Sequence, residues 1–382
     1  MKFGNEGYEG KFGNEGNNLT MRLLYLYPEE WTGRRAREVH TLSTCVALAR
    51  SGAEVTLVTA GGERELRGHL RDVAEADEVA GLHLAALSRT LGPIRSAAIF
   101  KHHFQKWLPG QARFDWAYII HLKAAALLTQ THVMPYAYEA HEIFAQTPQT
   151  GEARQIKLHE LERAVLSGAA LRVATSAALA EALSTWFAVP DDFAVSPNAG
   201  GPPLERGVGA ADGPFVYAGS LADWKGLDRV IEASRDAETP LKIVGGTEEE
   251  WRRLGGQVET GGVAWQPRVP LAGLPEALAG ARAGLIPTEA GTPSGRYSCP
   301  MKLFDYARCG LPVLSTALPS LQGLEVGPWC TPVSALGRAG WAEALKNFRY
   351  DAAEGEAARA WAGGHTWAKR AEFLMAALRK RS

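Results

Sequence analysis

A lysine and an aspartate lie at the start of an expected helix in the segment SCPMKLFDYARCGLP, residues 298–312. Ser298 is a suitable N-cap and Pro300 has the fixed φ that suits a first turn, so the helix would present free backbone N–H groups to a phosphate. Lys302 opposes the helix dipole in that turn, which an anionic ligand nearby would explain. Asp305 can accept hydrogen bonds from sugar hydroxyls. The alternative is a well-capped core helix with a lysine and an aspartate on its surface.

A second cation follows an expected strand in the segment YAGSLADWKG, residues 217–226. Lys225 lies just before an expected helix, and a lysine at the mouth of a parallel sheet suits a pyrophosphate. The alternative is an ordinary surface lysine beside a glycine turn.

The loop PEEWTGRRAREVH, residues 28–40, carries a glycine and two arginines before a helix. Gly33 lets the backbone come close to a ligand, and Arg34 and Arg35 place two guanidinium groups at a helix start, where they oppose its dipole. An anionic ligand is again indicated. Pairing of these arginines with nearby glutamates of the loop and helix (Glu29, Glu30 or Glu38) is the alternative.

A histidine ends another expected strand, in the segment YEAHEIF, residues 138–144. His141 would face the edge of the sheet, and strand alternation places Glu139 on the same face, so that one side chain can tune the other. A hydrogen-bonded structural histidine is the alternative.

Motifs for several other chemistries are absent. The sequence has no Asp-x-Asp for a metal–diphosphate clamp and neither a Gly-x-Gly-x-x-Gly nor a Walker motif, so we expect no metal and no cofactor.

The composition is that of a soluble globular protein. The 382 residues carry a net charge of -1, which provides no global attraction to nucleic acid, and no nucleic-acid partner is expected. Four cysteines without a zinc or disulfide pattern favour the cytoplasm. Residues 1–20, which contain KFGNEG twice, are expected to be a disordered leader or tag.

Strand and helix signals then alternate, as in parallel sheets covered by helices. In the first half we expect strands at 22–27, 54–59, 82–87, 116–121, 136–141 and 171–175, with helices at 35–50, 99–107, 123–129 and 154–166. In the second half we expect strands at 215–219, 241–244, 262–265, 283–287 and 312–315, with helices at 227–235, 248–254, 274–279, 301–309 and 366–379.

This pattern predicts an α/β protein with two Rossmann-like domains and a cleft between them. The expected divisions are an N-terminal domain over 21–200, a Gly- and Pro-rich linker over 201–214, a C-terminal domain over 215–364, and a last helix over 365–382 that returns to the N-terminal domain.

In this order, the segments resemble the retaining glycosyltransferases of family 4, of the GT-B fold, from about Met21 to Leu378. The supporting motifs, in chain order, are TGRRAREVH, LARSGAEVTLVT, YEAHEIF, LERAVLSGAALRVATSAALAEAL, VSPNAG, VYAGSLADWKGLDRVIEA, LKIVGG, ARAGLIPTEAG, SCPMKLFDYARCGLPVLST and HTWAKRAE.

The resemblance implies roles for individual residues. Lys225 would hold the donor diphosphate and His141 would lie near the reacting sugar, as the catalytic pair, while the acceptor binds mainly to the first domain. The residues that the resemblance assigns to the donor are Gly33, Arg34, Gly219, Ser220, Lys225, Glu289, Tyr297, Ser298, Pro300, Met301, Lys302, Leu303 and Asp305.

Three positions depart from the usual pattern of this family. Tyr297 and Asp305 stand where an E-x7-E motif usually has its two glutamates, and Ser220 replaces a frequent arginine. Glu289, from the same loop, is a substitute for the missing acid, and a subgroup with GSL-x-x-W-K-G has similar variants.

The resemblance implies transfer of a sugar from a nucleoside-diphosphate sugar to a sugar or lipid-linked acceptor, with retention of anomeric configuration. The alternatives are a binding or scaffold protein that has lost the sugar-transfer activity and a sugar-nucleotide epimerase on this fold. The helix around 99–107 mixes basic and aromatic residues, which favours peripheral contact with the inner membrane surface.

Overall fold

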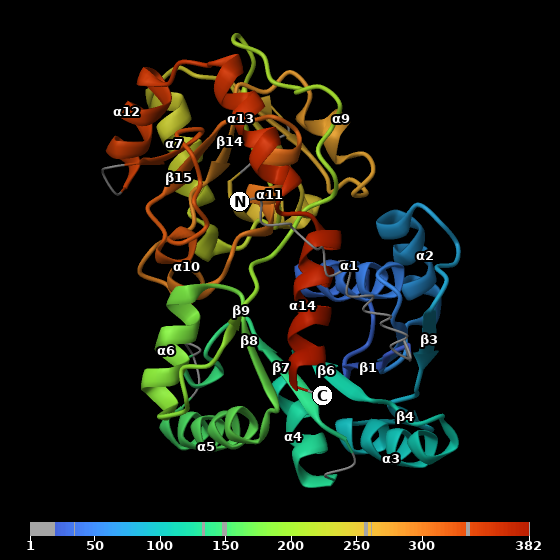
Figure 1. The fold of residues 1–382 in the computed structure, drawn as a ribbon. Coiled ribbons are helices and arrows are strands. Elements are labelled where there is room, and N and C mark those ends of the chain that lie inside the picture. Colours follow the sequence, from blue (N-terminus) through green and yellow to red (C-terminus); the bar gives the residue numbers. More distant parts are fainter. Residues whose placement is uncertain are drawn as a thin grey trace, which may run out of the picture.

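The computed structural model describes residues 20–33, 35–131, 134–146, 151–255, 259–260, 262–333 and 337–381. Two seven-stranded sheets, each covered by helices on both faces, form two bodies that meet along one side (Figure 1). The predicted α/β class with two Rossmann-like units is confirmed. Residues 1–19, which are all but the last residue of the expected leader, and Arg34 lie outside the described residues.

The first sheet is parallel and has the order β3-β2-β1-β6-β7-β8-β9. Its strands are β1 (Arg22–Tyr27), β2 (Glu54–Thr59), β3 (Leu82–Ala86), β6 (Trp116–Ile119), β7 (Tyr136–Ala140), β8 (Leu171–Ala174) and β9 (Ala194–Val195). The central strands β1, β6 and β7 are buried on both faces, apart from Arg22 at the start of β1, because helices cover both sides of the sheet, as parallel sheets require.

The two faces of this sheet are covered by different sets of helices. One face packs on α3 (Ala97–Trp107), α4 (Leu122–Thr131), α5 (Glu152–Gly168) and α6 (Ala177–Phe187). The other packs on α1 (Ala36–Arg50), α2 (Glu63–Ala74) and α14 (Trp367–Arg381). A short hairpin of β4 (Thr90–Leu91) and β5 (Ile94–Arg95) precedes α3.

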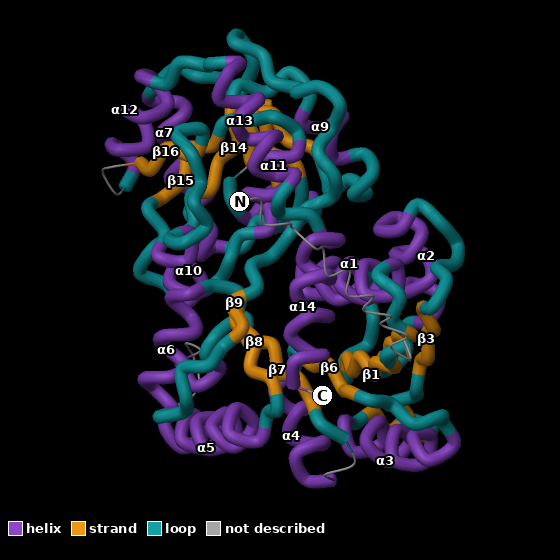
Figure 2. The backbone as a smooth tube through the Cα atoms, viewed as in Figure 1, coloured by secondary structure: helices purple, strands orange, loops and turns teal. Residues whose placement is uncertain are grey.

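The second sheet has the order β12-β13-β11-β10-β14-β15-β16, and only the pairing of β12 with β13 is antiparallel among its described strands. Figure 2 draws its strands in orange and labels β14, β15 and β16. Its strands are β10 (Phe215–Ala218), β11 (Leu241–Val244), β12 (Glu259–Thr260), β13 (Val263–Gln266), β14 (Ala283–Ile286), β15 (Val313–Thr316) and β16 (Cys330–Val333). Its helices are α7 (Leu227–Asp236), α8 (Glu248–Arg253), α9 (Leu274–Leu278), α10 (Pro293–Tyr297), α11 (Met301–Arg308), α12 (Arg338–Asn347) and α13 (Ala352–Gly363).

The connection between the sheets, residues 201–214, contains no helix or strand. It is nevertheless attached to the second unit, because Leu204 and Val208 donate backbone hydrogen bonds to the carbonyls of Arg308 and Cys309, both at 2.9 Å. These bonds hold the Gly- and Pro-rich linker against the second unit.

Helix α14 lies beside α1 on the first sheet, although it follows the whole second unit in the chain (Figure 1). Leu374, Met375 and Leu378 of α14 are buried in the core shared with β1 and α1. A backbone bridge between Gly200 and Thr366 marks where the chain crosses back.

Candidate functional site

The candidate residues lie in each sheet near the point where the strand order reverses. In the first sheet the order reverses between β1 and β6, and in the second between β10 and β14. Ligands of doubly wound sheets bind beyond the carboxyl ends of strands at such points. Gly33, His141, Gly219 and Glu289 all lie in loops that follow these or neighbouring strands.

Two lysines meet at the edge of the second sheet. The Lys302 Nζ lies 3.6 Å from the centre of the Tyr217 ring, and a Cβ on Gly219 would lie 3.2 Å from this Nζ. The Lys225 Nζ lies 3.7 Å from the centre of the Trp224 ring. The Tyr217 hydroxyl donates a hydrogen bond to the Ser220 carbonyl at 2.6 Å, which ties the ring to the loop after β10.

Neither ammonium group forms an ion pair within the described residues. The buried Nζ of Lys302 has no hydrogen-bond partner there, and no described carboxylate forms an ion pair with Lys225. Burial lowers the pKa of Lys225 to about 8. Burial and then the neighbouring Lys225 charge hold the pKa of Lys302 well below its usual range. Two desolvated cations side by side are unfavourable unless an anion joins them.

The helix α11 begins at Met301, where it is expected, but its N-cap is not the residue that the sequence suggests. Its N-cap is Pro300, with no side-chain cap, whereas Ser298 ends the preceding short helix α10. The prediction of Ser298 as N-cap is wrong because α10 extends to Tyr297 and Ser298 is used as its C-cap. Leu303 N–H bonds back to the Pro300 carbonyl at 3.1 Å, so the N–H groups of Met301 and Lys302 are the uncapped donors of the first turn.

The acidic candidates lie in different surroundings. Asp305 is half-buried on α11, and burial raises its pKa to about 6, opposed by Arg308 and Lys302. The carboxylate of Glu289 is paired with the guanidinium of Arg229. Glu289 is therefore already neutralised, whereas Asp305 keeps oxygen atoms available in the same region as Lys302.

Tyr297 joins the two units. Its hydroxyl donates to the side-chain oxygen of Gln146 at 3.2 Å, and its carbonyl accepts a hydrogen bond from the Ser176 hydroxyl at 3.0 Å. Nearby, the side-chain amide of Asn198 donates to the carbonyl of Cys299. The segment that precedes α11 is thus held by the first unit.

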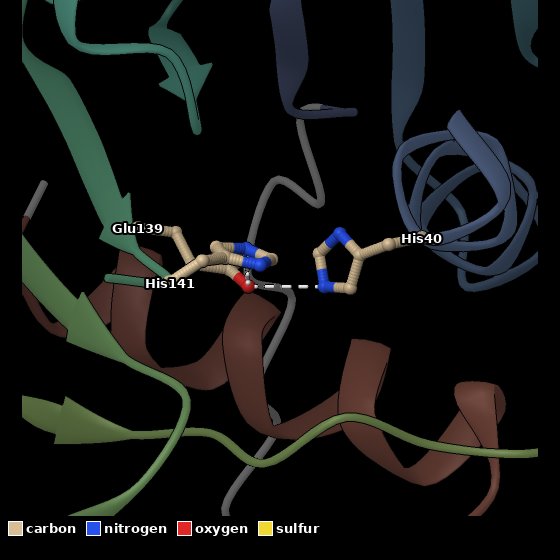
Figure 3. Close-up of side chains that lie close together, drawn as sticks. All are labelled: His40, Glu139 and His141. Atoms are coloured by element: carbon tan, nitrogen blue, oxygen red, sulfur yellow. Dashed lines mark ion pairs between the residues drawn. The ribbon is translucent and has the colours of Figure 1, made fainter. Parts of the chain in front are cut away.

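On the first sheet, Glu139 is the centre of a buried charged cluster with His40, His141 and Arg370. Figure 3 shows Glu139 with the two histidines. Its Oε1 lies 3.0 Å from the Nε2 of His40, 2.9 Å from the Nε2 of His141 and 2.6 Å from the Nη2 of Arg370. The Tyr118 hydroxyl donates to its other oxygen. His141 is the member that reaches the surface, since the other side chains are buried.

The protonation states follow from this burial. Burial disfavours the charged form of Glu139, but the guanidinium of Arg370 and the two imidazoles hold the pKa of Glu139 well below its usual range. Burial lowers the pKa of His40 to about 4, so its ring is neutral at pH 7. The cluster therefore contains a fixed carboxylate against which His141 is held.

Two imidazoles and one carboxylate are also a set that can bind a divalent metal, and these ligand atoms lie within 4.8 Å of one another. Arg370, however, donates to the same Oε1 that a metal would need. A dication at that oxygen would lie against a buried guanidinium with little water to screen it. The cluster fits an ion-pair network better than a metal centre.

The loop after His141 is held by a second buried carboxylate. Glu162 of α5 accepts hydrogen bonds from the N–H groups of Phe144 and Ala145, both at 3.2 Å. Burial raises the pKa of Glu162 to about 7, although these two bonds oppose the rise.

The glycine loop of the first unit has the backbone conformation that its sequence suggests, but one of its arginines is paired with a glutamate. Gly33 has φ +68°, in the left-handed region that favours glycine. The guanidinium of Arg35 forms an ion pair with Glu29 at 2.6 Å. Of the two interpretations that the sequence leaves open for Arg35, the structure adopts the pairing with a neighbouring glutamate.

Sequence reasoning missed three members of the Glu139 cluster: His40, Tyr118 and Arg370. They come from α1, β6 and α14, and Arg370 is 231 positions from Glu139 in the chain. The only signal in the sequence is polar residues on faces that are otherwise apolar, as with His40 in α1.

Two family models match this chain, one for each unit. Residues 37–199 match a model described as "Glycosyl transferase 4-like domain", and residues 213–344 match one described as "Glycosyl transferases group 1". No curated protein matches the chain.

Solved structures resemble nearly its whole length. The sucrose-phosphate synthase of Thermosynechococcus elongatus has a TM-score of 0.72 at 17% identity, covering 94% of this chain and 98% of that one. HepE of Anabaena in complex with UDP has a TM-score of 0.66 at 14% identity, covering 94% and 100%. WaaG, a glycosyltransferase involved in lipopolysaccharide biosynthesis, has a TM-score of 0.63 at 17% identity, covering 94% and 98%.

These structures share the GT-B fold of two facing α/β units, and the two family models match both units in order. The chain belongs to the group 1 glycosyltransferases of the GT-B fold and is a nucleotide-sugar glycosyltransferase.

Proposed function

We propose that this enzyme moves a sugar from a nucleoside-diphosphate sugar to an acceptor with retention of the anomeric configuration and without a metal. The donor binds mainly to the second unit, at the carboxyl edge of β10 and β14, and the acceptor binds mainly to the first. HepE, which has this fold, has been solved with UDP and with UDP-glucose, which supports a nucleotide-sugar donor.

The pair Lys225 and Lys302 is the observation that supports the donor site most directly. Each ammonium group stacks on an aromatic ring and is desolvated, and neither forms an ion pair in the described part of the chain. A diphosphate between them and the uncapped start of α11 would satisfy both charges at once. Asp305, on the same helix, is then available for hydroxyl groups of the donor.

The reaction replaces one bond at the anomeric carbon by another. The bond from this carbon to the diphosphate oxygen breaks, and its electron pair leaves with the nucleoside diphosphate. The acceptor oxygen forms the new bond, and its proton passes to the departing phosphate. Catalysis then consists of alignment by both units and stabilisation of charge on the diphosphate by Lys225, Lys302 and the α11 dipole.

His141 is proposed to touch the reacting sugar. Its Nε2 is held by the buried Glu139, which fixes the ring at the edge of the first sheet. A partly exposed imidazole held against a fixed carboxylate can form a hydrogen bond with a neighbouring hydroxyl group, and the pair can stabilise positive charge that develops in the transition state.

The test is the substitution Lys225→Ala. We expect the turnover number for sugar transfer to fall by two or more orders of magnitude, because one charge on the leaving group loses its stabilisation. The matched control is Lys369→Ala, which removes an exposed lysine paired with Glu372 on α14 and should leave transfer unchanged. Near-normal transfer by a folded Lys225→Ala enzyme would refute the assignment.

Incubation of the enzyme with the donor alone distinguishes this activity from the two alternatives. Slow release of nucleoside diphosphate supports a transferase that uses water poorly as an acceptor. Binding without any release favours a scaffold protein, and a new sugar nucleotide without free nucleoside diphosphate favours an epimerase.

Peripheral membrane contact and a cytoplasmic location are also proposed. Residues 79–114 contain five lysines or arginines and no aspartate or glutamate, and Leu91 and Ile94 at the tip of the β4–β5 hairpin are exposed. No helix in the described residues is long and apolar enough to cross a membrane. The positive charge of residues 79–114 favours binding to an anionic membrane surface. The cytoplasmic location is proposed because the four cysteines are unpaired.

Co-sedimentation with phosphatidylglycerol vesicles tests the membrane contact. Lys101→Glu together with Lys106→Glu on α3 should abolish it, whereas Lys369→Glu should not. Equal binding to uncharged phosphatidylcholine vesicles would contradict the electrostatic argument.

A further inference from the structure

A pocket of about 590 Å³ lies on the first unit, between the loop after β1 and the segment that leads into the β4–β5 hairpin. This volume falls in the range of small-molecule sites. Its lining is almost entirely charged, and the residues are Glu29, Glu30, Thr32, Arg35, Ala36, Arg37, Arg89 and Arg95.

Two of the four arginines are neutralised within the pocket. Arg35 forms an ion pair with Glu29 at 2.6 Å, and Arg95 forms one with Glu30. These pairs use both glutamates of the lining.

The other two arginines have no carboxylate as close as those of Arg35 and Arg95 within the described residues. Among the described residues, Arg37 forms two long ion pairs, both at 3.8 Å, with Glu29 and Glu142, and Glu29 has a closer partner in Arg35. The buried Nε of Arg89 has no hydrogen-bond partner, and its guanidinium forms no ion pair within the described residues. The lining therefore carries surplus positive charge from two forked donors, a geometry that suits phosphate or carboxylate.

The position of the pocket relates it to the acceptor rather than to the donor. Glu142, which approaches Arg37, is the residue next to His141, and Glu29 lies 3.1 Å from His121 at the end of β6. The pocket is thus lined by loops at the carboxyl edge of the first sheet, while the lysine pair belongs to the second sheet.

We infer that the acceptor carries an anionic group, a phosphate or a carboxylate, and that Arg37 and Arg89 bind it in this pocket. This inference rests on the proposed function, because it names the chemical class of the acceptor for the same site. The anion would anchor the acceptor, and the hydroxyl that receives the sugar would lie toward His141. A phosphorylated sugar and the headgroup of a phospholipid offer the same chemistry.

The test compares two phosphorylated probes with their neutral counterparts by calorimetry. Glucose 6-phosphate is compared with glucose, and sn-glycerol 3-phosphate, as a lipid headgroup, with glycerol. We expect at least one phosphorylated probe to bind at least tenfold more tightly than its counterpart, and to weaken as sodium chloride is raised. The probe that binds more tightly identifies the source of the anion.

The variants Arg89→Gln and Arg37→Gln should each weaken binding of that probe about tenfold or more. The matched control is Arg113→Gln, an exposed arginine of the same acid-free stretch that lies outside the pocket, and it should bind as the wild type does.

Failure of this inference can be told apart from failure of the proposed function. If UDP or another nucleoside diphosphate binds the wild-type enzyme but neither phosphorylated probe binds more tightly than its neutral counterpart, the inference is overturned. The same holds if Arg89→Gln and Arg37→Gln bind the probe as Arg113→Gln does. If no nucleoside diphosphate of a full panel binds, the proposed function itself fails.

Discussion

The substitution Arg370→Met tests whether the Glu139 cluster is an ion-pair network that joins α14 to the first sheet. It keeps an unbranched apolar stem of similar length but leaves the Glu139 carboxylate buried without its guanidinium. Breaking a buried pair in this way costs about 3–5 kcal/mol. Arg370 also donates to the Pro197 carbonyl at 2.9 Å and to the Thr44 hydroxyl at 3.2 Å, and loss of these bonds adds about 1–3 kcal/mol.

We therefore expect Arg370→Met to lower the free energy of unfolding of the first unit by about 4–8 kcal/mol, a large part of what holds a domain together. Urea unfolding followed by circular dichroism and tryptophan fluorescence measures this change. The matched control is Arg381→Met on the same helix, because Arg381 forms an exposed pair with Asp192 at 3.0 Å, and its loss should cost about 0–1 kcal/mol.

The double variant Glu139→Gln with Arg370→Met separates charge from packing. A neutral amide no longer needs the guanidinium, so the double variant should be more stable than the sum of the two single changes predicts, by about 2 kcal/mol or more. If the changes are additive, or if Arg370→Met costs no more than Arg381→Met, the cluster is not held by this charge pair.

Two further predictions concern protonation. The pKa of His40 is about 4 in the fold and 6.5 in a free chain, so the unfolded chain binds the proton first as pH falls. The free energy of unfolding should therefore drop by about 2 kcal/mol between pH 6.5 and 5. Urea unfolding of His40→Gln should show a shallower dependence on pH, and an unchanged dependence would argue against a buried neutral ring. Burial lowers the pKa of Lys225 to about 8 and that of Lys302 well below its usual range. Binding of a nucleoside diphosphate at pH 8 should therefore be accompanied by proton uptake, and the affinity should weaken as pH rises further. Calorimetry in two buffers of different ionisation enthalpy measures the uptake, and an absence of uptake would contradict the lysine pair.

Much of the fold follows from local patterns in the sequence. The strands β1, β2 and β11 have the bounds that their short apolar runs predict, because each run is closed by residues that favour turns. The short helix α10 was not expected, since five residues with a proline and a glycine give no helical period, and its presence moved the cap of α11 from Ser298 to Pro300.

The site was predictable only where neighbours in sequence are neighbours in space. Lys225 lies at the edge of the second sheet as the position of its strand suggests, and Lys302 joins it because α11 starts at the same edge. Glu139 was expected to contact His141, two residues away, but Arg370 could not be foreseen, because its position depends on how α14 packs after both units have formed. The pairing of Arg35 with Glu29 is equally a matter of rotamers, which residue types alone do not decide.

The return of α14 to the first sheet has a consequence during synthesis of the chain on the ribosome. Glu139 is made 231 positions before the arginine that neutralises it, which at about 5–20 residues per second is a delay of roughly 10–50 s. Until then the first unit lacks both this cation and the apolar face of α14 that covers β1 and α1. The nascent first half is therefore an incomplete domain that exposes part of its core, and its folding can finish only after the second half has been translated.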